Sequence, residues 1–149
     1  MAAAGFTGKL RYRYRQVPLS HGAVDRIPVL LVHVSKGSSA TASFEGIVDS
    51  GASNCLFHGD IARALGISDL RTGKRSRTGG VVSGASMDLY AHEIRLHVGA
   101  DNFLLTGFFS DQLPIACLLG RNGFFDKYIV TFDPTETNPG FELTRVHRI

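Results

Sequence analysis

Short apolar segments with a two-residue repeat, separated by turn-forming residues, are the feature that most constrains how this chain folds. Ile94, Leu96 and Val98 alternate with polar residues, which is the pattern of a strand with one buried face. The chain also has 17 glycines among its 149 residues, and glycine favours tight turns over helices. We therefore predict one all-β domain over residues 1–149, a compact closed β-barrel-like lobe with one or two short helices.

The same patterns divide the chain into short elements without repeats or a low-complexity linker. Residues 27–34 are apolar on both faces, which predicts a central strand. A turn at 36–39 joins it to a second strand over 42–48, and the two predict a hairpin. Further predicted strands cover residues 10–15, 55–57, 89–98, 103–109, 115–119, 129–133 and 141–146; helical segments are expected at 59–65 and 121–128, and a polar loop or strand at 69–78.

Composition and charge exclude several classes of protein. The net charge is +3, and four of the 16 basic residues lie between positions 9 and 15. There they alternate with apolar residues, which indicates a strand with one solvated face, so we do not expect nucleic-acid binding. No apolar run is long enough to span a bilayer, and the first residues lack the apolar core of a signal peptide, so we expect a cytoplasmic protein without a membrane contact. Cys55 and Cys117 stand in apolar strands and are expected to be inert, buried thiols.

No group of residues has the spacing of a metal or cofactor site. The six histidines are scattered along the chain. His92 and His97 lie one residue too far apart for the zinc motif H-E-x-x-H and would point to opposite faces of a strand. We expect no metal and no cofactor.

One segment of the sequence has residues suited to catalysis or ligand binding. An apolar strand ends at Val48 and delivers Asp49 into the small-residue sequence Ser50-Gly51-Ala52. Taken alone, Asp-Ser-Gly is an ordinary Asx turn. Its position after an apolar strand places the carboxylate at the edge of the core, where small residues let a ligand approach closely.

Three stretches together resemble the retropepsin-like (retroviral-type, single-lobed) aspartic proteases, in the form found in bacteria. Residues 48–52 match the hydrophobic-Asp-Ser/Thr-Gly-Ala signature of that family. The glycine-rich residues 79–86, followed by the strand 89–98, stand where the family has its flap. Residues 117–122 match its hydrophobic-hydrophobic-Gly-Arg stretch. The resemblance covers about residues 28–133.

The resemblance implies an aspartic endopeptidase that acts as a homodimer, because the chain has only one such triplet and the mechanism needs two carboxylates. Asp49, Ser50 and Gly51 would form the catalytic triplet, with Ser50 bonded across the dimer axis. Ala52 and the flap would hold a polypeptide substrate in an extended conformation. The implied flap residues are Gly80, Val81, Val82, Ser83 and Gly84, and the implied structural supports are Leu118, Leu119, Gly120 and Arg121.

Departures from the family pattern keep other functions open. Many viral members have an acidic residue where this chain has Ser53, so the usual ion pair of Arg121 is not expected. The basic stretch 74–77 and the C-terminal hairpin are also unlike the viral enzymes. One alternative is a catalytically silent domain of the same fold that binds peptides or partner proteins. Another is a β-domain whose basic arm binds nucleic acid, which salt-dependent oligonucleotide binding would indicate.

Overall fold

The computed structural model describes residues 8–79 and 86–146, and 56% of it is strand. One short α-helix, α1 (Gly59–Ala64), and one turn of 3-10 helix, η1 (Leu70–Thr72), are the helical elements of the described part. The strands are β1 (Lys9–Tyr12), β2 (Arg15–Pro18), β3 (Val24–Ile27), β4 (Val29–Lys36), β5 (Ser39–Ala40), β6 (Phe44–Val48), β7 (Leu56–His58), β8 (Lys74–Gly79), β9 (Ser86–Val98), β10 (Asp101–Ser110), β11 (Cys117–Leu119), β12 (Tyr128–Asp133) and β13 (Gly140–Arg145). The predicted all-β class is confirmed.

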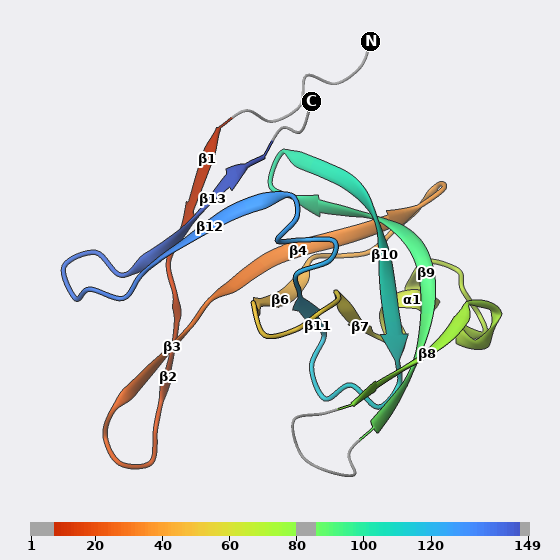
Figure 1. Ribbon diagram of the computed structural model, residues 1–149, viewed down its shortest axis with the longest axis horizontal. Coiled ribbons are helices and arrows are strands. Elements are labelled where there is room, and N and C mark those ends of the chain that lie inside the picture. The colour runs from red at the N-terminus through yellow and green to blue at the C-terminus, as the bar shows by residue number, and fades with distance from the viewer. Residues whose placement is uncertain (1–7, 80–85, 147–149) are drawn as a thin grey trace.

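Six of these strands close into a barrel (Figure 1). Their order is β4-β6-β11-β7-β10-β9, and pairing of β4 with β9 closes the ring. The predicted hairpin is present as the antiparallel pair β4–β6. The pairs β6–β11 and β7–β10 are parallel. Closure removes most free strand edges, while β5 and β8 extend the sheet at its two ends.

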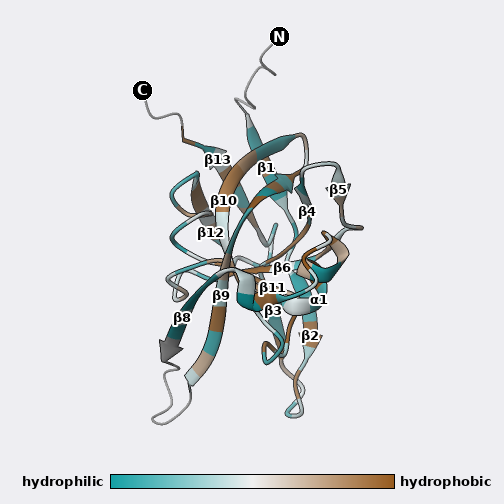
Figure 2. Ribbon diagram, turned by 90° about the vertical axis from the view of Figure 1, so that its right-hand side faces the viewer, coloured by the Kyte–Doolittle hydropathy of each residue, from teal (hydrophilic) through white to brown (hydrophobic). Residues whose placement is uncertain are grey.

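The interior of the barrel is filled by the alternate residues that the sequence pattern singled out. Ile94, Leu96 and Val98 of β9 are buried, and Figure 2 shows hydrophobic and hydrophilic segments alternating along this strand. Phe57 and Phe109 stack in the core with ring centroids 5.3 Å apart. Burying one such ring contributes roughly 1.5–3 kcal/mol, so the barrel wall is a stable support for the loops at its ends.

The predicted strand over residues 10–15 is two strands in two different sheets. β1 pairs with β13 in the three-stranded sheet β1-β13-β12, while β2 pairs with β3 in a separate hairpin that projects from the body (Figure 1). The chain leaves the first sheet after Tyr12 and enters the second at Arg15. The expected alternation holds across the break, since Arg11, Arg13 and Arg15 are exposed.

The helix predicted over residues 121–128 is wrong. This segment forms a series of turns in which the N–H groups of Phe125 and Asp126 donate to carbonyls five residues earlier. Gly123 has φ +109°, which no α-helix contains. The N–H groups of Arg121 and Asn122 are bonded to the loop around residue 52, so this segment of turns also anchors that loop.

The region predicted as polar loop or strand contains η1 and β8. β8 pairs antiparallel with the first half of β9, up to Gly79 opposite Ser86. The five flap residues expected from the resemblance, 80–84, lie outside the described residues, so the flap stays a prediction. In the described part of the chain, no helix is long and apolar enough to cross a membrane.

Candidate active site

The end of β6 places Asp49 between two neighbouring segments. β6 runs parallel to β11, with Val48 opposite Leu119. The Asp49 N–H donates to the Leu119 carbonyl at 3.0 Å, and the Val48 N–H donates to the Pro28 carbonyl at 2.9 Å. Val48 and Leu119 are both buried. The backbone that carries the carboxylate is therefore fixed on both sides before the chain turns into the loop.

Asp49 and the next three residues form a tight turn closed by the aspartate side chain. Asp49 Oδ1 accepts the Gly51 N–H at 2.8 Å, and the Asp49 carbonyl accepts the Ala52 N–H at 3.2 Å. A Cβ at Gly51 would lie 3.1 Å from Oδ1. The turn is an Asx turn, and its second carboxylate oxygen, Oδ2, takes no part in that closure. Asp49 and Ala52 are half-buried, whereas Ser50 and Gly51 are exposed.

The segment after β11 is hydrogen-bonded to this loop and packs closely against it. The N–H groups of Arg121 and Asn122 donate to the Ala52 and Ser53 carbonyls, both at 2.9 Å. Gly120 lies so close that a Cβ there would be 2.2 Å from the Asn54 carbonyl oxygen. Only glycine fits at this position, because an added methyl group would overlap a backbone atom.

Arg121 takes a partner different from the ion pair of the viral pattern. Its Nη1 donates to the Ser50 carbonyl at 2.7 Å. Position 53 is a serine, and the guanidinium instead ties the strand β11 to the loop through a backbone oxygen. The structure thus brings Leu119, Gly120 and Arg121 against the loop. Leu118 does not reach the loop by this pairing, because it stands opposite Ile47, two residues before Asp49.

An apolar cavity of about 380 Å³ opens beside β6, the strand that leads into the loop. Ile47, which lines it, lies two residues before Asp49 on extended backbone, so the two side chains face the same side of the chain. The cavity rim carries an ion pair between Arg15 and Glu45. The sequence did not reveal this cavity, because its lining comes from four separate segments. The lining residues are Arg15, Ile27, Val29, Glu45, Ile47, Ile115, Ala116 and Cys117.

Both cysteines are buried, as predicted. Desolvation raises the pKa of Cys55 to about 12 and that of Cys117 well above its usual value. A thiol with a raised pKa carries almost no thiolate at neutral pH, and the thiolate is the nucleophile. Neither cysteine therefore supplies a nucleophile near Asp49.

One group of described residues has metal-ligand chemistry, away from the Asp49 loop. Donor atoms of His58, Asp60 and Asp111 lie within 4.8 Å of one another. The Arg63 guanidinium donates to both carboxylates, at 2.7 Å to Asp60 and 2.5 Å to Asp111. His58 Nδ1 accepts the Asp60 N–H at the start of α1. A cation would have to displace the guanidinium, so the group is an ion-pair network as it stands.

Comparisons with known proteins agree with the barrel and its loop. No family model matches the chain, and no curated protein matches its sequence. Among solved structures, a retropepsin-like aspartic protease from Rickettsia conorii matches with a TM-score of 0.61 at 18% identity, over 93% of this chain and 91% of that one. The EIAV protease in complex with the inhibitor HBY-793 matches with a TM-score of 0.47 at 14% identity, over 65% of this chain and 84% of that one. The match to the Rickettsia conorii structure shows that the closed lobe has the fold of a single-lobed acid protease. In particular, the fold is retropepsin-like.

Proposed function

We propose that the protein is an aspartic endopeptidase that acts as a homodimer, with Asp49 of each chain at the dimer axis. The observation that carries this proposal is the half-buried Asp49 on a retropepsin-like fold, whose carboxylate accepts the Gly51 N–H and whose own N–H donates to the Leu119 carbonyl. Among the described aspartates, Asp49 alone is followed by Ser-Gly. A mechanism that needs two such carboxylates therefore needs two chains.

The chemistry follows from two carboxyl groups in close contact. Like charges that close cannot both ionise, so the pair holds one proton. The ionised carboxylate removes a proton from a water molecule, and the oxygen of that water attacks the peptide carbonyl carbon. The protonated carboxyl gives its proton to the carbonyl oxygen as negative charge develops there. The resulting tetrahedral species then breaks its C–N bond, with a proton passing to the leaving amine.

The substrate is a polypeptide in an extended conformation. Gly51 is exposed, and in this proposal its carbonyl pairs with the peptide backbone while Ala52 contacts the bound peptide. The apolar cavity beside Ile47 suits an apolar side chain next to the scissile bond. In this proposal residues 80–84 cover the peptide from the opposite side, and Ser50 hydrogen-bonds across the dimer axis.

The decisive test replaces Asp49 by asparagine, which is nearly isosteric but cannot act as a base. We expect Asp49→Asn to lose peptide hydrolysis and to keep the circular dichroism spectrum of the wild type. The measurement is mass-spectrometric cleavage profiling of a peptide library at acidic and neutral pH, because the paired carboxyls must hold one proton. Wild-type turnover in the purified variant would exclude Asp49. A wild type that binds library peptides without cleaving them would indicate the silent binding domain instead.

A mixing experiment tests the dimer. A heterodimer of wild-type and Asp49→Asn chains has one carboxylate only and is expected to be inactive. At constant total protein and random pairing, an equal mixture leaves about one quarter of the dimers wild type on both sides. We therefore expect activity to fall to about one quarter. A fall to one half would mean that each chain works alone, and full activity of a monomer in the analytical ultracentrifuge would lead to the same conclusion.

A further inference from the structure

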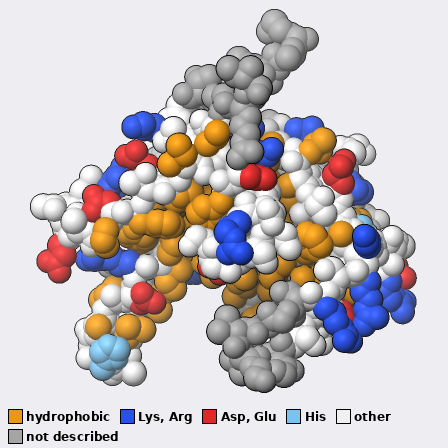
Figure 3. Space-filling model, viewed as in Figure 1, with side chains coloured by type: hydrophobic (Ala, Val, Ile, Leu, Met, Phe, Trp, Pro, Cys, Tyr) orange, Lys and Arg blue, Asp and Glu red, His pale blue; other side chains and the backbone are white. Residues whose placement is uncertain are grey.

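Basic side chains gather around β8, at the far end of the sheet from β5. Arg71, Lys74, Arg75 and Arg77 lie within seven residues of one another and are exposed. Figure 3 shows Lys and Arg side chains concentrated over this part of the surface, at the lower right of the view. We call these four residues the β8 basic strip. Two carboxylates, Asp69 and Asp88, are bonded to it, which leaves positive charge in excess.

Two arginines of the strip share a single carboxylate oxygen. Arg75 Nη2 and Arg77 Nε donate to Asp88 Oδ1, at 3.0 and 3.2 Å. These hydrogen bonds, first that of Arg75 and then that of Arg77, lower the pKa of the Asp88 carboxyl, so it stays ionised. One negative charge cannot neutralise two guanidinium groups. Both arginine side chains are more than half exposed, and exposed ion pairs of this kind exchange partners at little cost.

The strand under the strip lies at the edge of the described sheet. β8 is the last strand of the eight-stranded order and pairs with β9 alone among the described strands. Its other edge offers backbone N–H and C=O groups to an added strand. Charged side chains on such an edge keep apolar strands from adding to it. A strand that carries negative charges meets no such barrier, because its side chains attract the same arginines.

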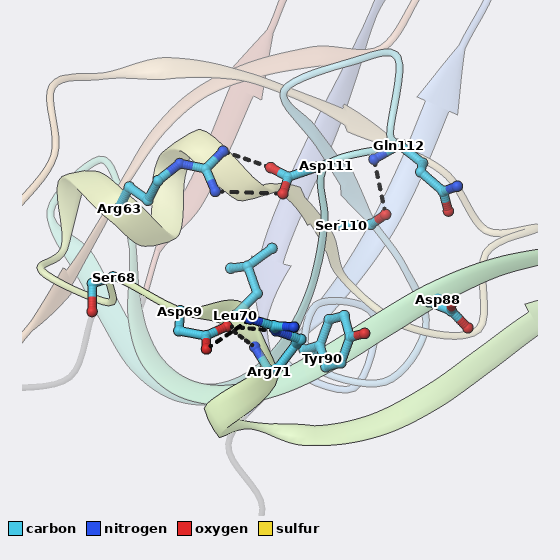
Figure 4. Close-up of a pocket in the computed structure, with 10 residues that line it drawn as sticks. All are labelled: Arg63, Ser68, Asp69, Leu70, Arg71, Asp88, Tyr90, Ser110, Asp111 and Gln112. Carbon is cyan, nitrogen blue, oxygen red and sulfur yellow. Dashed lines mark hydrogen bonds and ion pairs between the residues drawn. The ribbon is translucent and has the colours of Figure 1, made fainter.

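A polar cavity of about 430 Å³ continues the strip on the same face of the sheet. Arg75 stands opposite Tyr90 and Arg77 opposite Asp88, and residues paired across strands share a face. Tyr90 and Asp88 also line the cavity, together with Arg71 of the strip. In the close-up of Figure 4, Arg71 is bonded to Asp69 beside the Tyr90 ring, and Arg63 is bonded to Asp111 across the cavity. Strip and cavity are therefore one continuous polar surface.

We propose that the β8 basic strip binds an acidic polypeptide segment in an extended conformation, which adds to the edge of β8 and places acidic residues at alternate positions opposite Arg75 and Arg77. Alternate residues of a strand lie about 6.6–6.8 Å apart on one face, so the spacing of the two arginines matches an acidic residue at every second position. None of the residues of the strip or of its cavity belongs to the Asp49 loop, and binding to them does not require hydrolysis there.

The edge favours a peptide over a nucleic acid. A strand edge alternates donors with carbonyl acceptors, which complements another peptide backbone but repels the phosphates of an oligonucleotide at every carbonyl. Asp69 and Asp88 add further repulsion along the strip. A peptide can place neutral residues beside these two carboxylates, whereas a phosphodiester chain carries a charge on every unit.

The test measures fluorescence anisotropy of a labelled peptide with alternating Asp and Thr, titrated with the full-length protein. A peptide of the same composition with its aspartates in one block is the spacing control, and a form N-methylated at alternate residues is the backbone control. We expect the alternating peptide to bind more tightly than both. Binding should weaken as salt is added, because the charges involved are exposed.

A double variant tests the two arginines. We expect Arg75→Gln with Arg77→Gln to weaken binding of the alternating peptide by about tenfold, roughly threefold for each exposed pair. Lys9→Gln with Arg13→Gln removes the same charge from exposed positions at the other end of the molecule, and should leave the affinity unchanged. Equal affinity for the block and alternating peptides, or equal losses in the two double variants, would overturn the proposal. So would binding of a single-stranded oligonucleotide by the strip without binding of the peptide.

Discussion

Gly120→Ala is the substitution that most directly tests whether the segment after β11 positions the Asp49 loop. A Cβ at this position would be 2.2 Å from the Asn54 carbonyl oxygen and 2.8 Å from that of Ala52. Real Cβ atoms essentially never approach closer than 3.0 Å. The loop and β11 must therefore separate by about 0.8 Å or more at this point, since both contacts are to backbone atoms that cannot rotate away.

The size of the effect follows from that displacement. Forcing a methyl group into a packed site costs about 1–3 kcal/mol of stability, which a closed barrel of this size tolerates. A displacement of about 1 Å at a catalytic group can cost about 100-fold in rate. We therefore expect Gly120→Ala to remain folded and to lose about two orders of magnitude in kcat/KM for peptide hydrolysis.

The assay combines peptide hydrolysis with urea denaturation, and Gly22→Ala serves as the matched control. Gly22 lies in the β2–β3 turn with φ +86°, and a Cβ there meets no atom within 4 Å. The left-handed conformation alone costs about 1–2 kcal/mol for alanine, so the control loses similar stability without touching the loop. If Gly120→Ala were folded and hydrolysed peptide at the wild-type rate, the loop would not depend on β11 as the structure indicates. Equal loss of activity in both variants would attribute the effect to stability alone.

Two further predictions concern stability. Tyr128→Phe removes the hydroxyl that donates to the buried Asp101 carboxylate. The loss of this hydrogen bond should lower the free energy of unfolding in urea by about 1.5–3 kcal/mol. A change below about 0.5 kcal/mol would show that another donor takes the place of the Tyr128 hydroxyl. Burial, then the stacked His33 ring and Arg95, lower the pKa of His97. The unfolded chain then binds a proton near pH 6.5 that the folded chain does not, so the free energy of unfolding should fall as the pH drops through that value. Carboxyl groups with a lowered pKa titrate below about pH 4, so they do not change the free energy of unfolding between pH 7.5 and 5. His97→Gln should flatten the pH dependence between pH 7.5 and 5, and an unchanged slope would assign it to other groups.

Local patterns in the sequence were sufficient for the elements that carry the loop. The apolar run before Asp49 predicted a strand that ends at Val48, and β6 ends there. Helix α1 was predicted one residue longer than it is. These predictions succeed because a two-residue or helical repeat depends only on near neighbours, which the sequence shows directly.

Contacts between distant segments account for what the sequence left open. The break of the predicted strand after Tyr12 depends on which partner each half finds, β13 or β3. The turns over residues 121–128 replace a helix at Gly123, whose φ is positive, and Arg121 and Asn122 bond to a loop about 70 residues earlier. Local propensity does not depend on such distant partners. The apolar cavity beside Ile47 was missed for the same reason, because its lining comes from separate segments of the chain.

The way the loop is held places few demands on the side chains around it. Most bonds that fix residues 49–53 join backbone groups, such as the Asp49 N–H to the Leu119 carbonyl and the Arg121 N–H to the Ala52 carbonyl. Every residue except proline supplies both groups, so most positions around the loop are free to vary. The requirement for particular residues falls on the carboxylate of Asp49, on the Arg121 guanidinium, and on Gly120, where no other residue leaves room. A short motif and its bonds to the segment after β11 are therefore enough to hold this loop in place.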